Sequence, residues 1–164
     1  MPYLYNIAGV VGCLRAAITA SLLAQGEAAT MVPATYAVEQ YQFSQFPLPL
    51  TFIEIGHTGI DRDVGPQAVG LNFSGCIYHA RARDESGDAE VIALTRLGGI
   101  GAAIELDFKL LNSGGANIPI QKVEPTALLV GGSEKIMYAL GNSFENISLA
   151  VVAMPFTIIW NEGP

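Results

Sequence analysis

The chain has 164 residues and a mass of 17.3 kDa, which is the size of one domain, and we treat residues 1–164 as a single folded unit. Hydrophobic residues make up 51% of it and charged residues only 14%, which excludes a disordered chain and leaves a thinly charged surface. The net charge of −7, with eight scattered Lys and Arg, argues against specific nucleic-acid binding, because phosphates are neutralised by clustered basic side chains. We therefore expect partner subunits to cover part of the surface.

The first predicted element is an amphipathic helix over residues 4–24. Arg15, near its centre, disfavours a membrane span by about 2.5–3.5 kcal/mol, and residues 1–6 lack the positive charge of a signal peptide. The opposite face carries small residues, so we expect burial on two sides, by the protein's own sheet and by a neighbouring subunit. Apolar residues recur on one face at spacings of three and four, namely Leu4, Ile7, Val11, Leu14, Ile18 and Leu22, and the small residues are Ala8, Ala17, Ala20 and Ala24.

Strand patterns follow the helix. Residues 35–46 and 50–55 are rich in β-formers, with Pro47 and Pro49 between them, and the Gly-punctuated polar segment 56–66 predicts a loop. Residues 67–82 alternate over a long stretch and predict the clearest strand of the sequence. One of its faces carries Val69, Leu71, Phe73, Ile77 and His79, and the other carries Asn72, Ser74, Cys76 and Tyr78.

The second half predicts a helix followed by further strands. An acidic turn at 83–90 leads into helical spacing over 91–111, with Asp88 as N-cap, a stop at 112–114, and a break or kink at Gly98, Gly99 and Gly101. Strands are expected at 118–123, 126–130 and 146–160, while 134–140 fits either a helical turn or a strand. Pro155 predicts an edge or a bulge in the last strand. The order predicts an α+β fold with antiparallel pairing.

One loop offers a possible metal site, in His57, Asp61 and Asp63, the residue types that a small metal-dependent hydrolase uses as ligands. His79 is the only other histidine, and its strand pattern places it on an apolar face. We favour a solvated loop, and we predict no enzymatic activity, no metal and no cofactor. Cys13 and Cys76 are expected to be buried free thiols rather than a disulfide.

Carboxylates gather in two loops of this weakly charged chain. The order at the acidic turn lacks the alternating register of a calcium loop. We predict that both loops face solvent and form parts of an assembly surface, and plain soluble loop tips are an equal alternative. The candidate residues are Asp61, Arg62, Asp63, Asp84, Glu85, Asp88 and Glu90.

The order of elements, closed by the apolar segment 147–160 (ISLAVVAMPFTIIW), resembles the tail terminator and tail completion (neck) proteins of long-tailed bacteriophages. The resemblance covers nearly the whole chain as architecture, without a fixed motif. It implies an antiparallel sheet packed by an N-terminal helix and a second helix, with a hairpin-like extension, and the glycine-kinked second helix expected from the residues departs from this family pattern.

The resemblance also implies a function in the virion. It indicates a structural protein, assembled in the host cytoplasm, that forms a homo-oligomeric, commonly hexameric ring on the tail tube. Its partners would be the tail-tube protein and the neck or connector protein, with no specific nucleic-acid binding and no membrane. A different viral tail-tube, neck or coat subunit remains an alternative.

Overall fold

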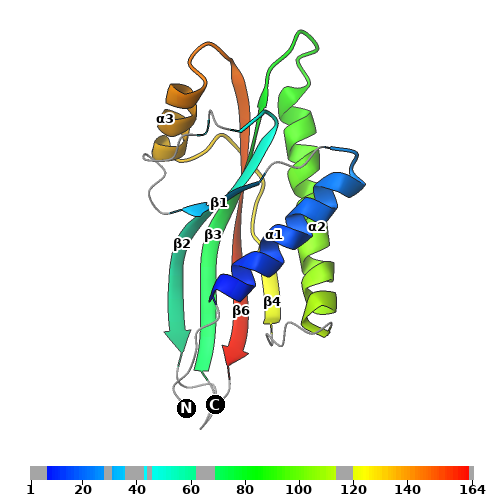
Figure 1. Ribbon diagram of the computed structural model, residues 1–164, viewed down its shortest axis with the longest axis vertical. Helices are drawn as coiled ribbons and strands as arrows, with labels where there is room; N and C mark the ends of the chain where they lie inside the picture. Colours follow the sequence, from blue (N-terminus) through cyan, green and yellow to red (C-terminus); the bar gives the residue numbers. More distant parts are fainter. Residues whose placement is uncertain are drawn as a thin grey trace.

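The computed structural model describes residues 7–27, 31–35, 43, 46–61, 69–113 and 120–162. These residues form an α+β fold in which helices cover both faces of a sheet (Figure 1). The helices are α1 (Ile7–Ala24), α2 (Ala89–Ser113) and α3 (Glu134–Ser143). The strands are β1 (Met31–Thr35), β2 (Leu50–Asp61), β3 (Val69–Ala82), β4 (Ile120–Pro125), β5 (Leu129–Val130) and β6 (Leu149–Glu162).

The sheet has the strand order β1-β2-β3-β6-β4, and β5 pairs with β6 beside β4. Every pair is antiparallel except β1 with β2, which run parallel. β2 and β3 form the long hairpin, and β3 pairs with β6 without a register shift from Val69↔Glu162 to Ala82↔Leu149. This confirms the predicted α+β class with its largely antiparallel sheet, and it places β6 in the middle of the sheet.

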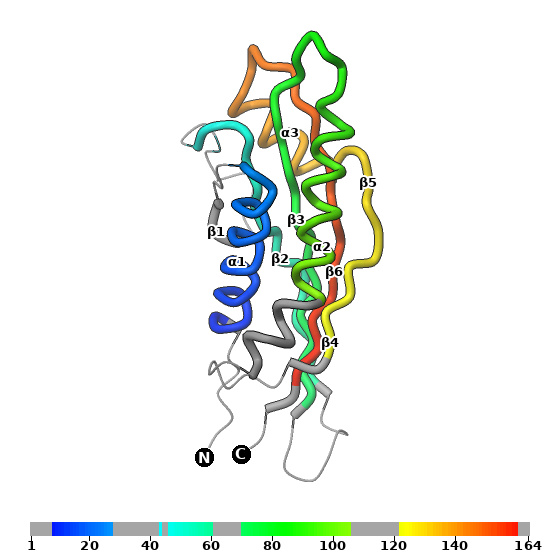
Figure 2. Tube along the Cα trace, turned by 90° about the vertical axis from the view of Figure 1, so that its right-hand side faces the viewer, coloured from blue at the N-terminus to red at the C-terminus, as the bar shows by residue number. Residues whose placement is uncertain are grey.

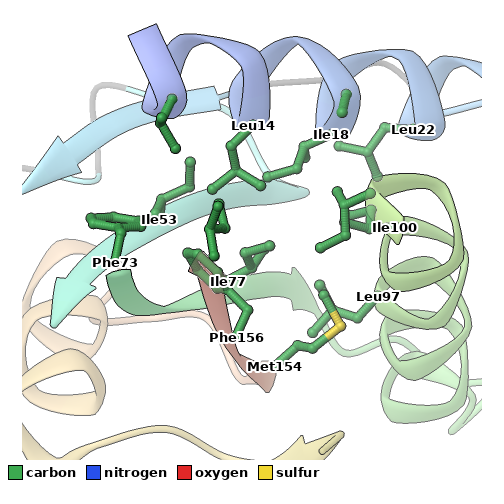
Figure 3. Packing of buried hydrophobic residues seen from close by; sticks show 14 of the residues in the cluster. Leu14, Ile18, Leu22, Ile53, Phe73, Ile77, Leu97, Ile100, Met154 and Phe156 are labelled. Carbon is green, nitrogen blue, oxygen red and sulfur yellow. The ribbon is translucent and has the colours of Figure 1, made fainter. Parts of the chain in front are cut away.

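Two hydrophobic cores lie on opposite faces of the sheet, because successive residues of β2, β3 and β6 point to opposite sides. The larger core joins the sheet to α1 and α2. Figure 3 shows Leu14 and Ile18 of α1 directed toward Ile53 and Ile77 of the sheet. The smaller core packs α3 against the other face, through Phe52, Tyr78, Ala80, Ile136, Leu140, Val151 and Ala153.

The buried face of α1 agrees with the predicted one at its centre and differs at its margin. Leu14, Ile18 and Leu22 are buried as expected, and Val11 is partly buried. Val10 is fully buried too, and Ala17, assigned to the outer face, is buried as well. Leu4 lies outside the described residues. None of the helices in the described ranges is long and apolar enough to cross a membrane.

The predicted loop at 56–66 is wrong for residues 56–61, which continue β2. The register shifts between Ile55 and His57, so Gly56 sits in a β-bulge. A Cβ at Gly56 would lie 2.7 Å from the carbonyl oxygen of Ser74, and one at Gly59 would lie 2.7 Å from the Asn72 amide. Both glycines therefore admit the neighbouring strand rather than marking a loop.

The predicted break in the second helix is also wrong, because α2 runs without interruption through Gly98, Gly99 and Gly101. A Cβ at Gly99 would lie 2.5 Å from the Gln25 amide nitrogen, and one at Gly101 would lie 3.1 Å from the Met154 sulfur. These two glycines serve close packing against α1 and β6. The helix starts directly after Asp88, whose carbonyl oxygen accepts from the Ile92 N–H at 2.9 Å, and it ends at Ser113, as predicted.

Other predicted elements shifted or changed type. Of the strand expected at 35–46, Thr35 is the last residue of β1 (Met31–Thr35) and Phe43 lies in a 3-10 turn, while residues 36–42, 44 and 45 lie outside the described residues. Residues 134–140 belong to a helix.

Pro155 causes no bulge against β3, and its strand is central rather than at an edge. Its carbonyl oxygen accepts from the Thr126 N–H at 2.9 Å, so its missing N–H faces the gap between β4 and β5.

Candidate functional site

The acidic turn between β3 and α2 is tied together by its own side chains. The Asp84 carboxylate accepts from the Ser86 N–H at 3.0 Å and from the Ser86 hydroxyl at 2.5 Å, and these bonds lower the pKa of Asp84. Glu90 accepts from Arg83 Nε at 2.7 Å, and this bond lowers the pKa of Glu90. Glu85 and Asp88 are exposed. The turn forms the upper end of the molecule in Figure 1.

The second candidate loop begins at the opposite end of the sheet. Asp61 is the last residue of β2 and pairs with Gly70, whereas Arg62 and Asp63 lie outside the described residues. Because β3 runs from Val69 to Ala82 at about 3.3 Å per residue, about 40 Å separates Asp61 from the acidic turn. Asp61 and the acidic turn therefore lie at opposite ends of the sheet and do not form one patch.

His57, the proposed metal ligand, lies in the strand just after the bulge and is exposed. No group of three or more His, Cys, Asp or Glu side chains in the described ranges is arranged to hold a metal ion.

A buried charge cluster joins α1, β3 and α2, and sequence reasoning missed it. The Glu27 carboxylate is 8% exposed and pairs with two arginines. Arg81 Nη1 donates to Glu27 Oε1 at 2.9 Å, and Arg96 Nε donates to Glu27 Oε2. Each carboxylate oxygen has its own cation, so the charge is compensated within the fold. The sequence signal, one Glu after a helix and two distant Arg, does not specify such a pairing.

His79 extends this cluster beneath α1. Its Nδ1 lies 2.8 Å from Thr51 Oγ1, and its Nε2 lies 3.4 Å from Arg81 Nη1. Because an arginine only donates, Nε2 is the accepting nitrogen and Nδ1 carries the proton. The pKa of His79 is lowered to about 4, chiefly by burial and also by Arg81 and Arg96, while Glu27 opposes the shift. A neutral, fully bonded histidine has a structural role, as its place on the apolar face suggested.

Cys13 and Cys76 are free and half-buried. Burial raises the pKa of Cys76 to about 11, so its thiol stays protonated at neutral pH. Cys76 and Tyr78 line a hollow of about 320 Å³ beside Ser133 at the start of α3, and the Tyr78 hydroxyl donates to Glu54 at 3.2 Å. A protonated thiol is a poor nucleophile, so Cys76 is not an activated group in this hollow.

The outward face of α1 is the first of two surfaces that are left uncovered. It is lined by Gly12, Arg15, Ala16, Thr19, Ala20 and Leu23, and we call it the α1 face. The Leu23 side chain is 61% exposed. Arg15 is the only charge on this face, and it makes no ion pair within the described part of the chain.

The second uncovered surface lies around α2, β4 and β5. A hollow of about 310 Å³, which we call the α2 hollow, is lined by Gly98, Gly101, Ala102, Glu105, Pro125, Thr126, Ala127, Leu128 and Met154. Glu105 is its only charged residue and is exposed. Next to it, Leu128, Leu129 and Val130 are 45%, 50% and 66% exposed. Local sequence patterns missed this surface, because residues far apart in the chain build it.

The two uncovered surfaces lie on different sides of the molecule. α1 is at one margin of Figure 2 and β5 is at the other. Neither a protein-family model nor a curated protein sequence matches the chain.

Proposed function

We propose that this protein is a non-enzymatic structural subunit that assembles with copies of itself. The observation that carries the proposal is the exposure of large apolar side chains on two sides of a chain with few charges. Leu23 on one side and Val130 on the other are 61% and 66% exposed. On the second side the consecutive residues Leu128, Leu129 and Val130 are all exposed, and grouped apolar side chains of this kind are typical of protein interfaces.

The assembly is a ring, specifically a tail terminator at the top of a bacteriophage tail tube that joins the tail to the neck or connector. This rests on the resemblance in element order and on the two uncovered surfaces, because unlike surfaces that pair head to tail form a ring when the rotation between copies closes. The net charge of −7 suits a channel through which DNA slides, because like charge keeps its wall from binding phosphates. The ring would belong to the virion, with the tail-tube protein as neighbour.

The mass and shape of the native particle test the proposal. We expect native mass spectrometry at micromolar concentration to give a closed oligomer of one fixed copy number, and negative-stain electron microscopy to show flat rings. A strict monomer across that concentration range contradicts self-assembly. Closed shells would instead indicate a coat protein, and open tubes a tail-tube protein.

A further inference from the structure

The α1 face and the α2 hollow carry opposite charges. Arg15 is the single charge of the first, and Glu105 is the single charge of the second. Neither makes an ion pair within the described residues. A charge surrounded by apolar and small side chains gains most from a partner of opposite sign when the contact excludes water.

A symmetric contact of two α1 faces brings like charges together. If a two-fold axis through the centre of this face relates the two copies, Arg15 of one copy lies near Arg15 of the other. The face holds no carboxylate to compensate the two charges. The arginine therefore favours a different surface of the next copy. The α2 hollow supplies the carboxylate.

The spacing along the two helices also matches. Arg15 and Leu23 are eight residues apart on α1, which is about 12 Å at 1.5 Å per residue. Glu105 and Gly98 are seven residues apart on α2, which is about 10.5 Å by the same rise. An α1 helix laid antiparallel to α2 thus brings Arg15 to Glu105 and Leu23 to Gly98, beside the exposed Leu128.

The residues between these two ends allow close approach. Gly12, Ala16 and Ala20 on α1 are small, and a Cβ at Gly98 would meet only Leu128 Cδ1, at 3.9 Å. Helices with small facing residues pack at short interaxial distances.

We propose that α1 of one copy docks in the α2 hollow of the next copy, with Arg15 paired to Glu105 and Leu23 seated against Leu128. This contact rests on the proposed self-assembly and specifies its interface. It is head to tail, so each copy uses its α1 face on one side and its α2 hollow on the other, as the contacts of the proposed ring require.

Charge reversal and mixing test the contact. Arg15→Glu places two carboxylates at the interface, and Glu105→Arg places two guanidiniums there, so each variant alone should assemble at least tenfold more weakly than the unaltered protein. When the two variants alternate in an equimolar mixture, every interface is complementary. The native Arg15 and Glu105 meet at one interface, and the two substituted side chains, again of opposite charge, meet at the next. We expect the mixture to recover oligomers, measured by light scattering after size exclusion. Native mass spectrometry should show equal numbers of the two variants in each oligomer.

Controls separate this contact from self-assembly in general. Glu85→Arg reverses an exposed carboxylate at the far end of the molecule and should leave the oligomer intact. Ala102→Trp fills the hollow without changing charge and should weaken assembly even if a charge variant folds poorly. Variants that assemble like the unaltered protein, or a mixture that does not recover, overturn the Arg15–Glu105 contact while self-assembly stands. A monomeric unaltered protein overturns both.

Discussion

Glu27 holds together three elements that are distant in sequence. It follows α1 directly and pairs with Arg81 of β3 and Arg96 of α2. Gln25 adds a bond from its amide to the Arg96 carbonyl oxygen at 3.1 Å. These polar contacts fix the end of α1 over the larger core, so the direction of the α1 face depends on them.

His79 gives the folded state a specific pH dependence. Its pKa is about 4 in the folded protein and 6.5 in its ordinary state. Below pH 6.5 the unfolded chain therefore binds a proton that the folded protein does not, so the free energy of unfolding falls as the pH is lowered toward 4. Each pKa unit is worth about 1.4 kcal/mol, so we expect a loss on the order of 2 kcal/mol between pH 7 and pH 5 from this group.

Urea unfolding of the unaltered protein and of His79→Gln, at pH 7 and pH 5, measures this contribution. The variant should lose less stability over that range, by the amount given above. His57→Gln, which changes an exposed histidine, is the matched control and should retain the full dependence. An identical pH dependence in His79→Gln would show that the buried histidine does not titrate as described.

At the scale of elements, α1 is attached to the sheet by a few fully buried side chains. Leu14 is 0% exposed and lies over Ile53 and Ile77 (Figure 3). Truncating a buried leucine removes apolar contact and leaves a cavity, so Leu14→Ala should lower the free energy of unfolding by about 2–5 kcal/mol. Val91→Ala, at a side chain that is 64% exposed, should change it by less than about 0.5 kcal/mol.

Denaturant unfolding at one fixed protein concentration measures both variants. Equal midpoints for Leu14→Ala and the unaltered protein would mean that α1 does not pack on the sheet as described.

Local periodicity predicted the elements whose burial follows a simple period. β3 alternates because its two faces meet different surroundings, and α1 has a spacing of three and four because one side of it packs on the sheet. Both elements were identified correctly. The errors at Gly56 and Gly99 have a common physical cause. Each glycine admits a group from elsewhere in the chain, the Ser74 carbonyl or the Gln25 amide, and a local pattern holds no information about such a neighbour.

The candidate surfaces were predictable to different degrees. Of the four small residues assigned to the outer face of α1, namely Ala8, Ala17, Ala20 and Ala24, only Ala20 lines the α1 face and Ala17 is buried, so that face was predicted only in part. The acidic turn follows from composition. The α2 hollow could not be predicted from local patterns, because Glu105 and Leu128 come together only when α2 packs beside the segment after β4. The Glu27 cluster was missed for the same reason.

At the scale of the whole molecule, the acidic turn at one end is available for a partner that stacks along the strands. Asp84 holds the turn through Ser86, so a charge change belongs at Glu85, which is exposed. Glu85→Lys should leave the fold intact and slow association with a basic partner surface at this end. Exposed pairs are worth about 0–1 kcal/mol, so the effect should appear mainly in association rate and salt dependence.

Association rates with the proposed partner, the neck or connector protein, from about 0.05 to 0.5 M salt, measure this effect. Glu85→Gln is the neutral control and should fall between the unaltered protein and Glu85→Lys at low salt, and all three should converge at high salt. Equal rates at low salt would leave the turn as a soluble loop tip.

The central position of β6 has a consequence for the order of folding. β4 and β5 pair with no strand other than β6 in the described sheet, and β6 follows them in sequence, across α3. The β2–β3 hairpin can form early from local contacts, whereas its pairing with β6 joins residues such as Val69 and Glu162, far apart in the chain. Such distant pairing closes long loops before it gains contacts, which makes folding slow. Until β6 arrives, β3 presents a bare fourteen-residue edge, and the nascent chain is at its most aggregation-prone in that interval.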